Sequence, residues 1–161
     1  MVQRLDEGMQ SLAEVIKKTT GKDITNYPGA GAAGGMGGGL LAFFNAELKP
    51  GTELLLKAID FSEKIKGADL IITGEGKADR QTAMGKVPYG ILKEAQKEHI
   101  PVIVLAGSIE NLPELNKAGF KGIFSIAPGP ITLEKAMEPE FAKENITRLV
   151  SQLYSVITSF G

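Results

Sequence analysis

Three short apolar runs in the second half of the chain constrain its fold more than any other feature of the sequence. They span residues 69–73, 102–106 and 123–126, and segments with helical patterns separate them. Strands that alternate with helices form a parallel sheet with helices on both faces. The sequence therefore predicts an α/β fold for residues 59–161, a three-layer parallel sheet of the Rossmann-like kind with flanking helices.

Residues 1–58 have a different character, and we expect them to form a helical, glycine-rich segment ahead of the sheet. Apolar residues between Leu5 and Ile16 recur at helical spacing, which predicts a helix over residues 1–18. Seven of the eleven residues from Gly29 to Gly39 are glycine, and this tract leads into a predicted helix over residues 40–46. Further helices are expected over residues 53–58, 61–66, 88–98, 112–118 and 132–160, the last with a break near Pro139.

Composition excludes several classes of protein. The 161 residues carry a net charge of −1 with no basic stripe, which argues against nucleic-acid binding, and the apolar runs are too short to span a membrane. The chain has no cysteine and a single histidine, His99. Any chemistry must therefore rest on carboxylates, lysines, hydroxyls and backbone amides, and we expect a cytoplasmic protein.

The glycine tract contains the dinucleotide-binding pattern G-x-G-x-x-G between Gly29 and Gly34. That fingerprint requires an apolar strand directly before it, whereas the preceding residues KDITNYP are polar and end in proline. This context argues against an NAD-dependent oxidoreductase. Two interpretations remain: the glycines allow close helix packing, or amides at the start of the helix bind an anion or a substrate.

The second informative segment is ITGEGKADRQTAMGKVPYG, which follows the first predicted strand. It misses the phosphate-binding P-loop pattern at two positions, Arg80 and Val87. Its glycines, lysines and carboxylates still suit phosphoryl transfer, because amides contact phosphate oxygens, lysine neutralises charge, and a carboxylate orients a hydroxyl or holds Mg²⁺. The alternative is a solvated loop. A third segment, LAGSIEN, offers Ser108 either as a ligand contact or as a helix cap.

Four segments together resemble the class-I glycerate kinases. They are PGAGAAGGMGGGLLAFFNAELKPG, ADLIITGEGKADRQTAMGKVPYGI, PVIVLAGS and FSIAPGPITLEKAM, in that order. The resemblance covers nearly the whole chain, but only the C-terminal part of the much longer family members. It implies that residues 1–161 are the C-terminal portion of such an enzyme, with residues 1–58 belonging to a second domain of the intact protein.

The resemblance implies ATP-dependent phosphorylation of glycerate to phosphoglycerate, with 2-phosphoglycerate as the usual product of this class. ATP and Mg²⁺ are the implied cofactors, and glycerate the implied substrate. The missing N-terminal half of the same enzyme and a second copy of the chain are the candidate protein partners, and we expect the chain alone to be inactive. The alternative from another class is a nonenzymatic α/β domain that binds a small anion.

The site residues are carried over by matching position in the family motif. Asp79 would orient or deprotonate the attacking hydroxyl, Lys86 would neutralise phosphate or carboxylate charge, and Glu75 would hold the metal. The expected substrate-binding or nucleotide-binding residues are Gly29, Gly31, Gly34, Gly35, Gly74, Gly76, Gln81, Thr82 and Ser108.

Overall fold

The computed structural model describes residues 2–110 and 112–159 and divides the chain into two compact units. We call Met1–Gly51 the N-terminal unit and Thr52–Gly161 the sheet unit. The sequence pattern placed the division after residue 58. Residues of helix α3 (Gly51–Ala58) pack within the sheet unit. Thr52 and Leu56 of this helix occupy the position that a side chain at Gly90 would need.

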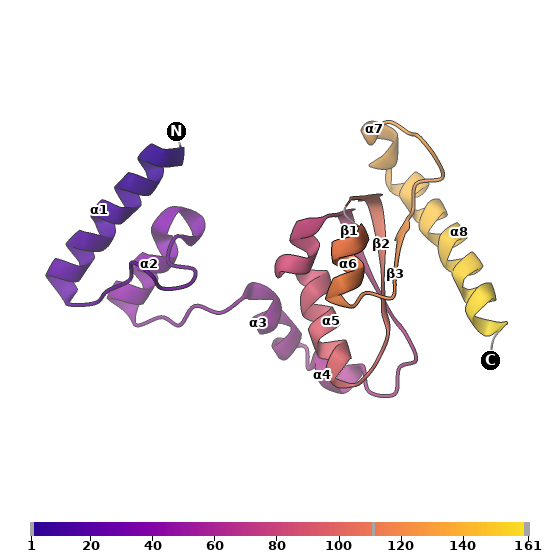
Figure 1. The fold of residues 1–161 in the computed structure, drawn as a ribbon, viewed down its shortest axis with the longest axis horizontal. Helices are drawn as coiled ribbons and strands as arrows, with labels where there is room; N and C mark the ends of the chain where they lie inside the picture. The colour runs from indigo at the N-terminus through magenta and orange to yellow at the C-terminus, as the bar shows by residue number, and fades with distance from the viewer. Residues whose placement is uncertain (1, 111, 160–161) are drawn as a thin grey trace. The chain divides into compact units, whose positions relative to one another are not determined.

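The N-terminal unit consists of two helices joined by a turn-rich segment (Figure 1). Helix α1 (Val2–Thr20) carries the predicted apolar stripe and ends where Gly21 adopts a positive φ and donates to the carbonyl of Lys17. Helix α2 (Ala32–Phe44) holds the glycine tract. The small core of this unit is formed by Ala13, Ile16, Ile24 and Ala42.

Helix α2 depends on its glycines in two ways. Its first turn is left-handed at Ala33, Gly34 and Gly35, a conformation that glycine adopts without the steric penalty of a side chain. One turn further on, a Cβ atom at Gly37 would collide with the carbonyl oxygen of Gly29. The tract therefore folds back against its own entry turn, as the packing interpretation requires.

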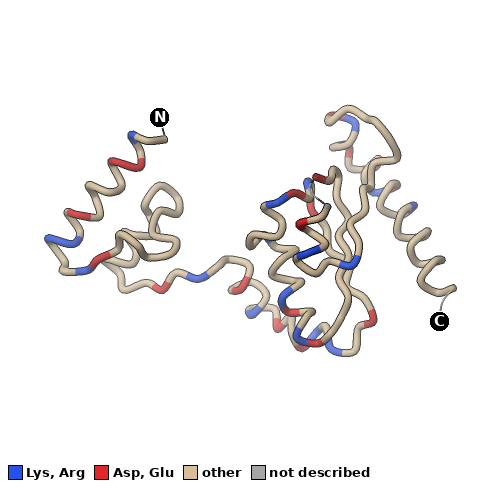
Figure 2. Tube along the Cα trace, in the orientation of Figure 1, with Lys and Arg blue, Asp and Glu red and all other residues tan. Residues whose placement is uncertain are grey.

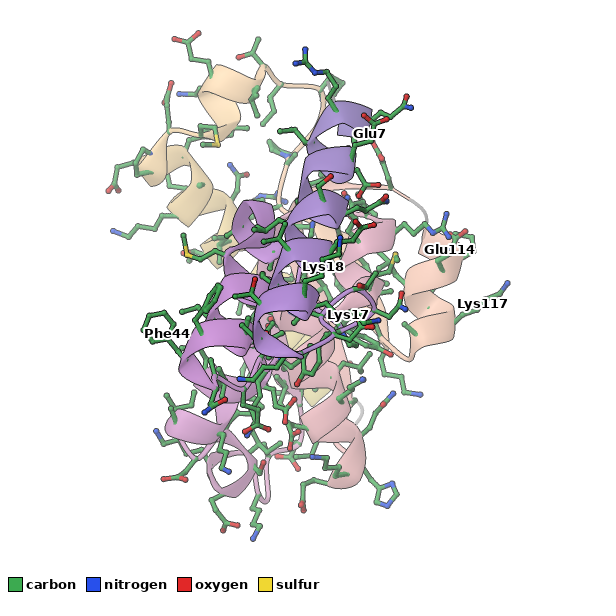
Figure 3. The ribbon with its side chains drawn as sticks, turned by 90° about the vertical axis from the view of Figure 1, so that its left-hand side faces the viewer. Glu7, Lys17, Lys18, Phe44, Glu114 and Lys117 are labelled. Atoms are coloured by element: carbon green, nitrogen blue, oxygen red, sulfur yellow. The ribbon has the colours of Figure 1, made fainter. Side chains whose placement is uncertain are left out.

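The surface of the N-terminal unit keeps several large apolar side chains exposed. Phe44 at the end of α2 is 76% exposed, and its ring extends away from the helix (Figure 3). No charged residue occurs in α2, which is uniformly tan in Figure 2. Any anion held by this helix would consequently be bound by backbone amides rather than by charged side chains of the helix itself.

The sheet unit confirms the predicted α/β fold. Strands β1 (Ile71–Ala78), β2 (Val102–Ile109) and β3 (Gly122–Ser125) form a parallel sheet in the order β1-β2-β3. Helices α5 (Val87–Lys97) and α6 (Leu112–Ala118) connect successive strands and lie on one side of the sheet, whereas α8 (Pro139–Thr158) lies on the other (Figure 1). This arrangement follows when both crossovers have the same hand.

The core of the sheet unit lies between the sheet and the helices α5 and α6. Alternate residues of β2, Val102, Val104 and Ala106, are almost inaccessible and pack in one cluster with Leu92 of α5 and Leu115 of α6. Burying such side chains is worth about 1.5–3 kcal/mol each relative to exposure. This cluster fixes the helix that follows the candidate site.

Strands β1 and β2 run further than their apolar runs predicted. The predicted strand ends at residues 73 and 106 were wrong, because the ladder continues through Gly74, Glu75 and Ser108. Backbone pairing, rather than side-chain hydrophobicity, sets where these strands end. A Cβ atom at Gly107 would lie 2.7 Å from the carbonyl oxygen of Gly76, so at this point of the ladder a side chain on β2 would collide with the backbone of β1.

Three short helical elements complete the described part of the sheet unit. They are α4 (Phe61–Lys64), the 3₁₀-helix η1 (Arg80–Met84) and α7 (Leu133–Ala136). The break expected near Pro139 is confirmed, because this proline opens α8 and an N-terminal proline fits a helix start. The expected helix limits at Met1 and Phe160 lie outside the described residues. Within residues 2–110 and 112–159, no helix has the length and apolar character to cross a bilayer.

Candidate functional site

A polar cluster forms where β1 ends and the chain turns into α5. It contains Glu75 from β1, Asp79 at the start of η1, Thr82 within η1, and Lys86 directly before α5. The apolar core beneath anchors both the strand and the helix, so the connecting residues are held from both ends. The carboxyl end of a parallel strand is the position where α/β folds place their binding sites.

Local hydrogen bonds explain the shape of the connection. The carboxylate of Asp79 accepts from the amide of Gln81 at 2.8 Å, and the hydroxyl of Thr82 accepts from the amide of Asp79 at 3.0 Å. The carboxylate of Asp79 also accepts from the amide of Thr82, so the two residues form a reciprocal capping box, which satisfies amides that a helix start leaves without partners. Asp79 therefore has a structural role in the turn besides any chemical one.

Glu75 is held on both sides. Its Oε2 accepts from the hydroxyl of Thr82 at 2.6 Å, and its Oε1 lies 2.9 Å from Nζ of Lys86. The side chain of Glu75 is only 14% exposed and Thr82 is completely buried. Charge-assisted hydrogen bonds of this kind are short and comparatively strong, so the carboxylate of Glu75 has a defined orientation.

Lys86 lies between two carboxylates. Its Nζ is 2.9 Å from Glu75 and 3.6 Å from Oδ1 of Asp79. The hydrogen bond that Lys86 donates to Glu75 and the charges of both carboxylates raise the pKa of Lys86 above its ordinary value, against the opposing effect of partial burial. Lys86 is accordingly a cation at neutral pH, and its side chain remains 38% exposed.

The cluster offers limited metal-binding capacity. No group of three or more His, Cys, Asp or Glu residues that could hold a metal ion occurs in the described part of the chain. Mg²⁺, however, is commonly bound by one or two carboxylates together with water and substrate phosphates. Both carboxylates already have protein partners: Glu75 contacts Thr82 and Lys86, and Asp79 accepts from amides of the turn and lies 3.6 Å from Nζ of Lys86.

Ser108 lies on the neighbouring strand, opposite Lys77 in the ladder. Lys77 itself forms an ion pair with Glu110 at 2.9 Å, which raises the pKa of the lysine. Glu110 is not among the site residues that the sequence predicts. The sequence feature that points to Glu110 is its position, because it lies two residues beyond Ser108 and after the end of an apolar strand.

The glycine-tract residues belong to the N-terminal unit and not to this cluster. Gly31 and Gly35 line a groove of about 460 Å³ between α1 and the turn before α2. No described atom lies within 4 Å of a Cβ built at Gly31. Ligand binding by Gly29, Gly31, Gly34 and Gly35 stays a prediction, while the packing role of the tract is visible in the structure.

Comparison with known proteins decides the family. A model described as the glycerate kinase family matches residues 1–158. The chain belongs to the glycerate kinase family. The resemblance noted in the sequence is therefore confirmed, and so is its α/β fold.

Individual relatives agree with this assignment. A glycerate kinase from Halalkalibacterium halodurans is 44% identical over 138 residues, covering 85% of this chain and 36% of the relative. A glycerate 2-kinase from Escherichia coli is 42% identical over 149 residues, covering 92% and 39%. A crystal structure of a "putative glycerate kinase 2" from Salmonella typhimurium LT2 matches with a TM-score of 0.70 and 34% identity, over 99% of this chain and 40% of that one. The chain thus spans about two fifths of the length of these glycerate kinase relatives.

Proposed function

We propose that this chain is the C-terminal part of an ATP-dependent kinase that phosphorylates glycerate, with 2-phosphoglycerate as the product. The observation that carries the proposal is the Glu75–Lys86–Asp79 cluster at the end of β1, in a chain of the glycerate kinase family. Relatives named glycerate kinase and glycerate 2-kinase support the substrate and the position phosphorylated. On the family alone, we propose the cytoplasm as its location.

In this proposal Asp79 acts on the attacking hydroxyl of glycerate. Its carboxylate accepts the hydroxyl proton while the hydroxyl oxygen forms a bond to the γ-phosphorus of ATP and the bond to the β-phosphate oxygen breaks, which releases ADP. Asp79 is suited to this role because the amides of the turn fix the orientation of its carboxylate beside Lys86. Lys86 would neutralise negative charge on the transferred group or on the carboxylate of glycerate.

Bound Mg²⁺ would supply charge neutralisation for the phosphates. Glu75 is the carboxylate proposed to hold this ion, with Asp79 left to act on the hydroxyl, and Glu75 would first have to release Thr82 or Lys86. Gly74 and Gly76 of β1, Gln81 after Asp79, and Ser108 of β2 remain proposed ligand contacts. The charge of the cluster disfavours the alternative of a simple anion-binding domain, since two carboxylates surround one ammonium group.

The test uses a protein of the relatives' full length that contains this chain. We expect ADP to form only when ATP, Mg²⁺ and glycerate are all present, and phosphorus NMR of the product to show the phosphate on the 2-oxygen. Omitting glycerate provides the control for background ATP hydrolysis. Absence of glycerate-dependent ADP would reject the kinase proposal, and tight binding of glycerate or phosphate without turnover would favour the binding-domain alternative.

A further inference from the structure

Thr82 is completely buried, and its hydroxyl group both accepts and donates a hydrogen bond. Its exposed fraction is zero, its oxygen accepts from the amide of Asp79, and it donates to Glu75. A threonine hydroxyl has a single proton. Because the amide of Asp79 occupies an acceptor position, that proton is directed to the carboxylate of Glu75. Thr82 thereby links the backbone of the turn to a side chain of the cluster.

The link continues from Glu75 to the ammonium group of Lys86. With Oε2 held by Thr82, Oε1 of Glu75 faces Nζ of Lys86 at 2.9 Å. Glu75 can rotate away only if the short hydrogen bond to Thr82 breaks, which would leave a buried hydroxyl donor without a partner. An unpaired buried polar group is costly. The position of Lys86 is thus restrained from the buried side of the cluster.

We propose that Thr82 is a positioning residue that acts through Glu75 to hold the ammonium group of Lys86 in place, rather than a residue that contacts substrate. The catalytic consequence rests on the proposed kinase function, but the positioning itself is a property of this chain. Complete burial gives Thr82 no surface for a ligand, whereas Lys86 keeps more than a third of its side chain exposed.

The positioning is testable by NMR on this chain with the variants Thr82→Val and Thr82→Ser. Valine has nearly the shape of threonine but cannot form either hydrogen bond, whereas serine can form both. In Thr82→Val we expect hydrogen exchange of the Asp79 amide to accelerate about tenfold, the loss typical of one hydrogen bond. We also expect relaxation of the Lys86 Cε carbon to approach that of Lys18, which has no ion pair among the described residues. Thr82→Ser should restore both signals.

Two further variants separate positioning from general damage to the fold. Glu75→Gln keeps the Thr82–Asp79 bond but weakens the contact with Lys86, so it should mobilise Lys86 while Asp79 exchange stays slow. Thr147→Val is the matched control, since Thr147 is exposed on α8 and its hydroxyl donates to the carbonyl of Lys143, far from the cluster in the sequence. It should change neither signal. If Thr82→Val prevents folding, Glu75→Gln and Thr82→Ser still test both links.

The proposal is overturned if Lys86 stays as ordered in folded Thr82→Val, or in Glu75→Gln, as in the parent chain. Activity provides a separate readout in the full-length protein. There Thr82→Val should lower kcat more than it raises KM, and Thr82→Ser should recover most of the loss. If Lys86 becomes mobile in this chain but kcat is unchanged, the positioning holds and the proposed role of Lys86 in the reaction falls.

Discussion

Asp79 illustrates how one side chain can serve the fold and the chemistry through different properties. The cap on η1 needs only an oxygen that accepts a hydrogen bond from the amide of Gln81. The proposed proton transfer needs the negative charge of the carboxylate. Asparagine supplies the first property and not the second, and it is as good a helix N-cap as aspartate. The two roles are therefore separable by one substitution.

Asp79→Asn in the full-length protein should lower kcat by about 10²–10⁴-fold, the range for loss of a general base. The unfolding midpoint should change little because the cap survives. Steady-state kinetics and urea denaturation measure the two effects. Asp69→Asn is the matched control, since Asp69 is exposed ahead of β1, and it should leave kcat unaltered. Near-normal turnover in Asp79→Asn would remove Asp79 from the mechanism.

A second residue-scale prediction concerns the pKa of Asp23. The hydrogen bond from Lys17, 2.6 Å long, together with bonds from Thr25, lowers this pKa from 3.8 to about 2. The Lys17–Asp23 ion pair therefore stabilises the folded N-terminal unit at pH values above 3.8, where the carboxylate is ionised in both the folded and the unfolded chain. This stabilisation is lost as the pH falls toward 2 and Asp23 becomes protonated. Carbon-detected NMR titration of the Asp23 carboxyl group measures this directly.

Lys17 and Lys18 both lie in the last turn of α1 (Figure 3), so they form a matched pair of sites. Lys17→Gln should return the pKa of Asp23 toward 3.8, because the largest cause of its depression is removed. Lys18→Gln should leave it near the parent value. Equal effects of the two substitutions would show that general charge, and not the specific hydrogen bond, lowers the pKa.

At the scale of elements, the β1–β2 ladder depends on an asymmetric pair of glycines. A side chain at Gly107 would meet the carbonyl of Gly76, whereas no described atom lies within 4 Å of a Cβ at Gly76. Gly107→Ala should destabilise the sheet unit by about 1–3 kcal/mol, as overpacking typically does. Gly76→Ala should be neutral or slightly stabilising. Urea denaturation followed by circular dichroism compares them, and equal stability would contradict the close approach of the strands.

Helix α2 offers a similar contrast within one element. Gly37→Ala should destabilise the N-terminal unit, since the new methyl group meets the carbonyl of Gly29. Gly39→Ala has open space and should stabilise the helix by about 0.5–1 kcal/mol. Amide hydrogen exchange across α2 measures both changes. Stabilisation by both substitutions would mean that the glycine tract does not pack against its entry turn.

These elements show what the sequence could predict. The apolar runs identified the three strands and the sheet, because burial of alternate side chains drives both the pattern and the structure. They did not predict the strand ends, because Gly74, Glu75 and Gly76 pair through the backbone regardless of side-chain polarity. Nor could the pattern predict that Thr82 bonds Glu75, since that contact requires the turn to fold first. The residues of the cluster were expected, but their partners were not.

At the scale of the whole molecule, the chain is much shorter than its relatives. The structural match includes 99% of this chain but only 40% of the crystal structure, so that relative has a further part that this chain does not contain. We propose that this part contributes to the catalytic site. The chain alone should therefore show no glycerate-dependent ADP release, and the full-length protein should show it. Coupled ADP assays on both measure this, and full activity of the chain alone would reject the proposal.

Because the space beside Gly76 is open, substitutions at this position can reveal whether a ligand binds there. At position 107, substitutions should reduce turnover whether or not a ligand binds there, because the neighbouring strand already fills the space that a side chain would occupy. Position 76 behaves differently, since folding leaves its outward side unoccupied. Variants that fold normally with alanine, serine or valine at position 76 but lose turnover would locate a ligand against the backbone of β1, without any bound structure.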